Sequence, residues 1–144
     1  MRISPDGLCI IKQFEGFSPV PYRCPAGLWT IGYGHVLLPH EMVVLRSIDK
    51  ADAQHLLTQD VAFAECAVAK LISRPLSQSQ FDALVSFTFN LGWGTLQRST
   101  LRRVINRGEE SAVAEQWLRF IWGAGRKLPG LMRRRRAELA LYQS

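Results

Sequence analysis

The chain has 144 residues, of which 47% are hydrophobic and 21% are charged. These values fit one compact domain with its own core and argue against a disordered chain. No apolar run approaches the roughly 18 residues that a membrane span needs, and the stretch from Leu8 to Ile11 is too short for a secretory signal. We therefore expect no transmembrane segment and no export through a signal peptide.

The cysteines and histidines argue against a disulfide scaffold and against a metal site. Cys9, Cys24 and Cys66 are an odd number and too few for a disulfide framework. They form no CxxC pair, and the three histidines show no ligand spacing. We expect no metal and no cofactor.

The net charge of +6 is unevenly spread along the chain. Residues 1–92 hold 7 Lys/Arg against 8 Asp/Glu, whereas residues 93–144 hold 11 against 4. A basic half favours a polyanionic partner, which can be nucleic acid, a membrane surface or an anionic cell envelope. Charge alone does not choose among these.

Two kinds of segment begin the chain. Ser4 can cap a first helix, Pro5 suits its first turn, and Gly16 ends it directly after Glu15. Residues 17–40 are too rich in Pro and Gly for a long helix. Their short aromatic and β-branched pieces, 21–24 and 28–31, flank a turn at 25–27, which predicts a small antiparallel hairpin.

Helical patterns dominate from residue 49 onward. Asp49 can cap a helix whose apolar residues recur at spacings of three and four until Pro75. Ser77 and Gln80 have capping-box form and open a second helix that ends near Gly92. Shorter helices are predicted over 100–107, 110–122 and 131–142.

The clearest chemical pattern is Glu15-x8-Cys24-x5-Thr30. A glutamate ends a short helix on its apolar side, and a hairpin follows whose side chains can point back at it. Glycoside hydrolysis needs a protonated carboxylic acid and a second group that activates water or stabilises positive charge on the sugar. Taken alone, Glu15 can equally be a solvated glutamate at a helix end.

The motifs around this pattern resemble those of the phage lysozymes, or endolysins, of glycoside hydrolase family 24. The catalytic segment of that family is matched by Phe14-Glu15-Gly16, by residues 22–27 and by residues 29–35. Further matches follow in family order: residues 80–87, Phe89-Asn90-Leu91-Gly92, Ser99-Thr100-Leu101, and Gly130-Leu131 with Arg134, Arg135 and Glu138. The resemblance therefore covers nearly the whole chain.

The resemblance implies a catalytic role for three residues. Glu15 is the general acid, Cys24 stands at the second catalytic position, and Thr30 helps to hold the attacking water. The best-known members have aspartate where Cys24 stands, and an ordinary thiol is only about 3% ionised at neutral pH. Cys24 can thus have a lowered pKa, act as a neutral polarisable group, or attack the sugar directly; it can also be a small buried filler.

Other residues are expected to support the fold or to bind substrate. Four residues in or just after the predicted hairpin are expected to support the fold: Tyr22, Gly32, Gly34 and His35. Asp60 is a suitable ion-pair partner for His35, and this pairing should depress the pKa of Asp60. The substrate-binding candidates that the resemblance implies are Phe89, Asn90, Thr100 and Gln116. The four tryptophans can stack on sugars, although a core position is the default for each.

The run Arg133-Arg134-Arg135-Arg136 cannot face one way on a helix. One interpretation is a solvated helix on which Arg134 pairs with Glu138 at i, i+4. The other is contact between Arg133, Arg134, Arg135 and Arg136 and an anionic envelope.

The resemblance implies an α+β, lysozyme-like fold in which a small β-hairpin lobe and a larger helical lobe flank a substrate cleft. We expect one domain over 1–144, with a hairpin-containing lobe at about 1–48, a connecting helix at 49–74 and a helical lobe at 75–144. The implied function is a muramidase that cuts peptidoglycan glycan strands during host lysis. We expect a monomer that waits in the host cytoplasm until a separate membrane-permeabilising protein admits it to the periplasmic wall.

The alternative function is a catalytically inert basic protein that binds the anionic envelope or nucleic acid. The chain has no helix-turn-helix, zinc-finger or oligonucleotide-barrel signals, and its acidic first part would repel phosphate. We therefore expect no nucleic-acid partner.

Overall fold

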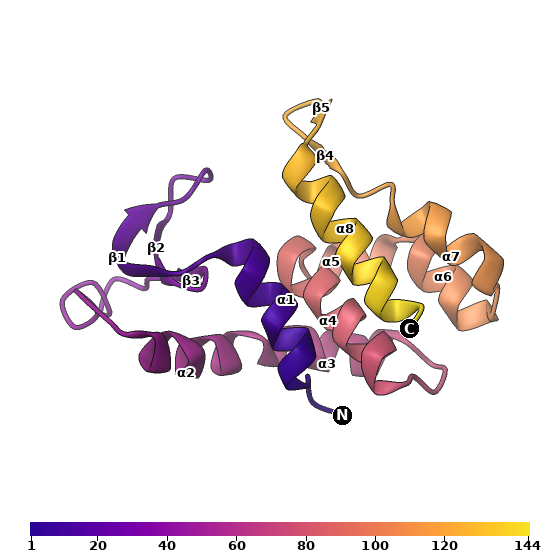
Figure 1. Ribbon diagram of the computed structural model, residues 1–144, viewed down its shortest axis with the longest axis horizontal. Helices are drawn as coiled ribbons and strands as arrows, with labels where there is room; N and C mark the ends of the chain where they lie inside the picture. Colours follow the sequence, from indigo (N-terminus) through magenta and orange to yellow (C-terminus); the bar gives the residue numbers. More distant parts are fainter. The chain divides into compact units, whose positions relative to one another are not determined.

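The computed structural model describes residues 1–144 and is mostly helical, with two small antiparallel sheets (Figure 1). None of its helices combines the length and apolar character needed to cross a membrane. The elements in chain order are α1 (Pro5–Glu15), β1 (Ser18–Arg23), β2 (Trp29–Gly32), β3 (His35–Val36), α2 (Lys50–Asp60), α3 (Ala62–Leu71), α4 (Gln78–Leu91), α5 (Trp93–Arg98), α6 (Thr100–Arg107), α7 (Glu110–Trp117), β4 (Trp122–Gly123), β5 (Arg126–Lys127) and α8 (Pro129–Tyr142).

The chain forms two compact units. The hairpin unit comprises residues 11–62, and the helical unit comprises residues 1–10 and 63–144. The predicted organisation as one domain with segments 1–48, 49–74 and 75–144 stays a prediction.

Helix α1 begins and ends as its sequence predicts. The Ser4 carbonyl accepts from the Leu8 amide at 3.0 Å, and the Ser4 hydroxyl accepts from the Gly7 amide at 3.4 Å. At the other end Gly16 has a φ of +72°, which only glycine adopts without strain. Glu15 is therefore the last residue of the helix, and the chain turns directly after it.

The predicted hairpin is confirmed, and a third strand extends it. Strands β1 and β2 pair antiparallel with Tyr22 opposite Thr30, and β3 pairs with the other edge of β2 (Figure 1). This unit has its own small core on the α2 side, formed by Ile31, Leu37, Ile48 and Ala53. Gly32 allows β2 to pack closely against α2, because a Cβ there would lie 3.1 Å from the Ala53 side chain.

The single helix predicted over 49–74 is wrong in one respect: the structure breaks it at Val61 into α2 and α3. Asp49 and Asp52 form a capping box at the start of α2. The negative charge of Asp52 in the first turn also complements the helix dipole. Val61 is nonetheless buried, so the apolar spacing that predicted one helix continues through the break.

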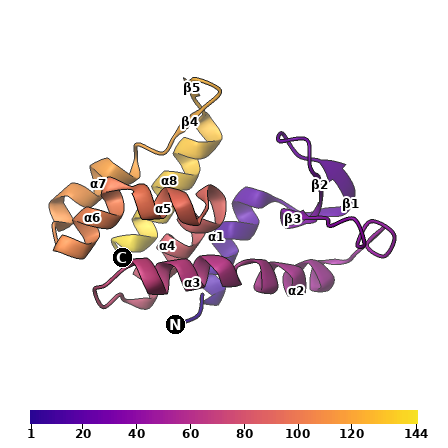
Figure 2. The same ribbon diagram turned by 180° about the vertical axis from the view of Figure 1, so that it is seen from behind.

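Helix α4 occupies the centre of the helical unit. Its capping box of Ser77 and Gln80 is confirmed, and Gly92 ends it at a φ of +92°. All eight residues from Phe81 to Thr88 are buried. Helix α8 packs alongside α4, and α6 alongside α7, in both ribbon views (Figure 2).

The C-terminal elements differ in detail from the prediction. Helix α6 has its predicted bounds, but α7 ends at Trp117 rather than at residue 122, and α8 begins at Pro129 rather than at residue 131. Between them Trp122 pairs with Lys127 in a two-stranded hairpin. Pro129 suits the first turn of α8, where its missing amide hydrogen is not needed.

Two of the four arginines of the run in α8 are buried. Arg134 and Arg135 are 3% and 0% exposed, and both approach Glu138, which is 0% exposed. Glu138 Oε2 accepts from Arg134 Nε at 3.2 Å and from the Ser86 hydroxyl at 2.5 Å, while Trp117 Nε1 donates to its Oε1 at 3.3 Å. The predicted Arg134–Glu138 pair is therefore present but buried. Envelope contact through Arg134 and Arg135 was a wrong expectation, because neither side chain reaches the surface.

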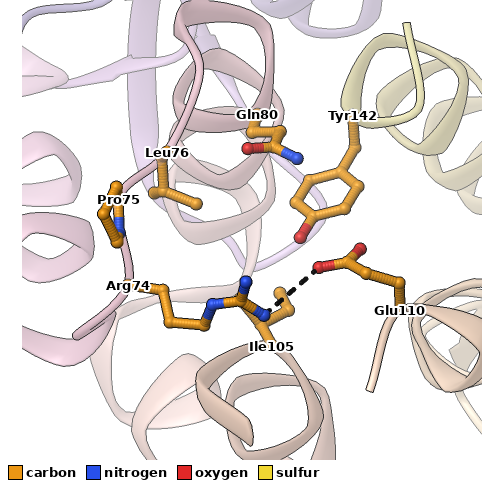
Figure 3. A pocket seen from close by; sticks show the side chains of 7 residues that line it. All are labelled: Arg74, Pro75, Leu76, Gln80, Ile105, Glu110 and Tyr142. Atoms are coloured by element: carbon orange, nitrogen blue, oxygen red, sulfur yellow. Dashed lines mark ion pairs between the residues drawn. The ribbon is translucent and has the colours of Figure 1, made fainter. Parts of the chain in front are cut away.

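A second ion pair of the helical unit lies at the surface (Figure 3). Arg74 Nη1 is 3.8 Å from Glu110 Oε1, beside a cavity of about 90 Å³ that Pro75, Gln80 and Tyr142 also line. The Tyr142 hydroxyl points toward this pair, and burial, with the charge of Glu110 adding to it, raises the pKa of Tyr142 to about 12. The two side chains of the pair remain about half exposed.

These two ion pairs predict losses of stability of different size for the same kind of substitution. Glu138→Ala leaves Arg134 and Arg135 buried beside each other without their shared carboxylate, so the free energy of unfolding should fall by about 3–5 kcal/mol. Glu110→Ala, the matched control, should cost less than about 1 kcal/mol because water screens that pair. Urea unfolding of both variants is the measurement, and equal losses would contradict the assignment.

Candidate active site

Glu15 is held against the turn between β2 and β3. Its carboxylate lies so close to Gly34 that a Cβ on this glycine would be 2.8 Å from Glu15 Oε2. Gly34 also has a φ of +79°, so glycine is required for the backbone as well as for space. The glutamate therefore lies against the hairpin, as the sequence pattern predicts.

An open hollow lies beside this carboxylate. Its volume is about 280 Å³, and it is lined by Glu15, Gly16, Phe17, Ser18 and Tyr22. Phe17 forms an apolar wall and contacts Tyr33 at a tilted angle, with ring centroids 5.6 Å apart. A polar ligand group can thus reach Glu15 from solvent without moving the hairpin.

Cys24 lies at the entrance of the turn between β1 and β2. The Cys24 amide donates to the Leu28 carbonyl at 2.9 Å, and the Gly27 amide donates to the Cys24 carbonyl at 2.8 Å, which closes the turn around the side chain. The Leu28 amide is the main cause that lowers the pKa of the Cys24 thiol. Partial burial acts in the opposite direction, and the amide of Ala26 and the hydroxyl of Thr30 lower the pKa further. The turn therefore favours the thiolate.

Thr30 is buried at the base of this turn, where it is 3% exposed. Its hydroxyl donates to the Leu28 carbonyl at 3.0 Å and can instead donate to the Cys24 sulfur. One hydroxyl has one proton, so it serves the carbonyl beside a neutral thiol and the sulfur beside a thiolate. The structure thus brings Cys24 and Thr30 together.

Tyr22 connects the two halves of the site. Burial raises the pKa of Tyr22, and the charges of Glu15 and Cys24 raise it further. Its phenol therefore lies in the field of both groups and stays protonated as a donor at neutral pH. The sequence had indicated only a supporting role for Tyr22.

His35 links the hairpin to α2 through two carboxylates. Its Nδ1 lies 2.7 Å from Asp60 Oδ2, and its Nε2 lies 3.0 Å from Glu41 Oε2. Burial disfavours the imidazolium, but the bonds and charges of Asp60 and Glu41 outweigh it and raise the pKa of His35. The pair with Asp60 agrees with the sequence; the second carboxylate, from Glu41, was not expected.

The depressed pKa expected for Asp60 is wrong. Burial, with the charge of Glu41 adding to it, raises the pKa of Asp60 more than the hydrogen bond and charge of His35 lower it. Glu41 lies on the other side of the imidazole ring and has a lowered pKa. Burial acts to raise this pKa, but the Leu38 amide and the hydrogen bond and charge of His35, with the charge of His40, lower it by more.

The four substrate-binding candidates lie on three helices of the helical unit. Phe89 lies beside Phe63 with the two rings tilted and their centroids 6.2 Å apart, and the Asn90 side-chain carbonyl oxygen accepts from Arg135. Thr100 is the exposed first residue of α6, and Gln116 is half-buried on α7. Since Arg135 only donates, the Asn90 amide nitrogen is left to face other partners.

Comparison with known proteins identifies the family of the chain. The family model described as phage lysozyme matches residues 12–138. The chain belongs to the phage lysozyme family. An endolysin of Acyrthosiphon pisum secondary endosymbiont phage 1 is 36% identical and is aligned over 100% of this chain and 99% of its own length.

Two solved structures extend the family evidence to the fold. An endolysin from Escherichia coli O157:H7 phage FAHEc1 superposes with a TM-score of 0.88 at 36% identity, covering 99% of this chain and 93% of its own. The muramidase domain of SpmX from Asticaccaulis excentricus gives 0.89 at 35% identity, covering 99% and 98%. The fold is therefore α+β and lysozyme-like, and family membership makes the chain a glycosidase.

The raised pKa of His35 predicts how stability depends on pH. A raised pKa contributes stability that is fully present below the unperturbed value of about 6.5 and is lost as pH rises through the folded value. Unfolding free energies between pH 6 and 9 should therefore fall in the wild type, and His35→Gln should lack this component. His55→Gln, at an exposed histidine, is the control and should keep it. An identical slope for wild type and His35→Gln would overturn this assignment.

Proposed function

We propose that the chain is a bacteriolytic muramidase that hydrolyses the β-1,4 bond between N-acetylmuramic acid and N-acetylglucosamine in host cell lysis by a phage or prophage. The main support is that a carboxylate lies against Gly34 of the hairpin and that the same hairpin carries a thiol whose pKa is lowered. Glycoside hydrolysis uses such an acid and anion on the two sides of one bond.

Glu15 is the general acid in this proposal. Its protonated carboxyl gives the proton to the glycosidic oxygen as the bond from that oxygen to the anomeric carbon breaks. The leaving sugar departs with a hydroxyl, and positive charge develops on the anomeric carbon and ring oxygen. Water then supplies hydroxide to that carbon, and its second proton restores the acid.

Cys24 acts as a thiolate that faces the developing positive charge. The Leu28 and Ala26 amides and the Thr30 hydroxyl hold the anion in place before the sugar arrives, so little reorganisation is needed in the transition state. Thr30 is a positioning residue for the sulfur as well as a candidate for holding the water. Tyr22 lines the hollow beside Glu15 and lies in the field of both groups.

The cellular setting is a further part of this proposal. We propose a monomer that waits in the host cytoplasm and reaches the periplasmic wall through a separate membrane-permeabilising protein. Phe89, Asn90, Thr100 and Gln116 are its proposed sugar contacts. Arg133 and Arg136 are exposed and remain available to an anionic envelope.

Clearing of chloroform-treated Gram-negative cells tests the two catalytic groups. Glu15→Gln should lower the rate by about 10²–10⁴-fold, the usual contribution of a positioned acid. Cys24→Ala and Cys24→Ser should lose about 100-fold or more, because neither side chain forms an anion at neutral pH. Cys24→Asp should stay active, since aspartate supplies the charge without help from the turn.

A double Cys9→Ser/Cys66→Ser variant is the matched control, because both thiols are exposed and lie outside the site. It should clear cells at the wild-type rate. If Glu15→Gln clears cells as fast as the wild type, the enzymatic proposal fails and an inert basic envelope-binding protein becomes the better account.

A further inference from the structure

Arg135 is a fully buried arginine with few hydrogen bonds of its own. It is 0% exposed, and its guanidinium lies 5.2 Å from the centroid of the Phe87 ring. Its Nη1 is 3.3 Å from Glu138 Oε1, but neither Nη1 nor Nε has a hydrogen-bond acceptor. Buried donors without acceptors cost stability, and an apolar side chain in such a place is often as stable or more stable. Packing alone therefore does not explain a guanidinium here.

The charge of Glu138 does not explain it either. Glu138 Oε2 already accepts from Arg134 Nε at 3.2 Å and from the Ser86 hydroxyl at 2.5 Å. Trp117 Nε1 donates to its Oε1 at 3.3 Å. The buried carboxylate thus has a cation and hydrogen bonds from other residues. Arg135 adds charge to this network without adding a hydrogen bond to it.

The hydrogen bond that Arg135 does make runs to Asn90. Its Nη2 donates to Asn90 Oδ1, which connects α8 to the last turn of α4. Phe87 stands three residues before Asn90 and therefore lies on the same face of α4, under the guanidinium. The aromatic ring and the carboxylate of Glu138 thus hold the guanidinium beside the Asn90 side chain.

This contact decides which way the Asn90 carboxamide faces. A guanidinium has N–H donors and no acceptor, so the carboxamide must turn its oxygen toward Arg135. The Asn90 Nδ2 group then points to the other side, and it makes no hydrogen bond within the chain. Without Arg135 the carboxamide could turn over, since its two ends have nearly the same size.

Asn90 lies where α4 reaches the surface. The residues from Phe81 to Thr88 are buried, whereas Phe89 and Asn90 are half-buried. Gly92 then ends the helix. A buried positive charge behind the carboxamide polarises it and strengthens Nδ2 as a donor toward solvent. The structure thus presents one oriented, unpaired N–H donor at this end of α4.

We propose that Arg135 is a positioning residue for glycan binding: it fixes the Asn90 carboxamide so that Nδ2 donates to the carbonyl oxygen of an N-acetyl group. This inference rests on the proposed function, which gives Asn90 a sugar contact. Both sugars of the cleaved glycan carry an N-acetyl group, whose carbonyl oxygen only accepts. A sugar hydroxyl both donates and accepts, so it would bind either end of the carboxamide and would not need Arg135.

Equilibrium binding of soluble peptidoglycan fragments tests the proposal, in a Glu15→Gln background so that the ligand is not consumed. Asn90→Ala should bind about fivefold more weakly, the order of one lost hydrogen bond. Asn90→Asp should lose as much, because it keeps an acceptor for Arg135 but has no N–H for the glycan. Ile105→Ala is the control: it removes buried volume from α6, outside this contact, and should bind within about twofold of the parent.

Arg135→Met separates positioning from a general effect on the fold. In the parent it should weaken binding about as much as Asn90→Ala does, and in an Asn90→Ala background it should weaken binding no further. A purely structural role would give the same loss in both backgrounds. If Arg135→Met does not fold, Arg135→Gln replaces it in the same cycle, because glutamine keeps a polar group but both donates and accepts.

Fragments whose N-acetyl groups have been removed identify the acceptor. On them the Asn90→Ala variant should bind as the Glu15→Gln parent does. Equal losses by Arg135→Met in the two backgrounds, parental affinity of Asn90→Asp, or an Asn90→Ala effect that persists on deacetylated fragments would overturn the proposal. So would a Glu15→Gln parent that binds no fragments. Hydrolysis is not measured in this assay, so failure of the catalytic proposal would be seen separately, in cell clearing by Glu15→Gln.

Discussion

The turn between β1 and β2 is the constraint on which the proposed chemistry depends. It brings the backbone amides of Ala26 and Leu28 around one sulfur and lowers the pKa of the Cys24 thiol. Thr30 completes this environment from the next strand, and the antiparallel register that sets Tyr22 opposite Thr30 fixes its place. A carboxylate at this position would be ionised without help; a thiol needs the turn to become an anion at neutral pH. The backbone amides of the turn thus supply part of the stabilisation that a thiolate needs at neutral pH.

The helical unit contains a different electrostatic arrangement. Glu138 sits between Arg134 and Arg135 with no exposure and accepts from Ser86 and Trp117 as well. Burial lowers the pKa of Arg135 to about 10, which leaves it charged at neutral pH. The Arg135 guanidinium then donates a hydrogen bond to the side-chain carbonyl oxygen of Asn90 at the end of α4. The same four-arginine run therefore divides into two buried residues that organise α4 and two exposed ones that remain for a ligand.

Local signals were sufficient for much of the fold and for the core of the site. Pro5 and Gly16 mark the ends of α1, the Ser77–Gln80 capping box marks the start of α4, and the 25–27 turn marks the hairpin, since each acts within a few residues. Long-range contacts were not predictable: nothing near Arg134 in the sequence indicates that it is buried, and nothing near Asp60 indicates that burial and the charge of Glu41 raise its pKa despite His35. The break at Val61 was missed because the apolar spacing continues through it. The β4–β5 hairpin was missed because each of its strands has two residues, which is too short for an alternating pattern. Glu41 had no signal beyond its charge, although the proximity of Glu15 to the hairpin followed from sequence spacing.

The most direct test of this account is the ionisation of Cys24, followed as the rate of thiol alkylation against pH in the Cys9→Ser/Cys66→Ser variant. The account predicts a midpoint below that of an unperturbed thiol, about 8.5, and a higher midpoint in Thr30→Val, which cannot donate to the sulfur. A midpoint at or above the ordinary value, unmoved by Thr30→Val, would show that the turn does not stabilise a thiolate and would contradict the proposed role of Cys24.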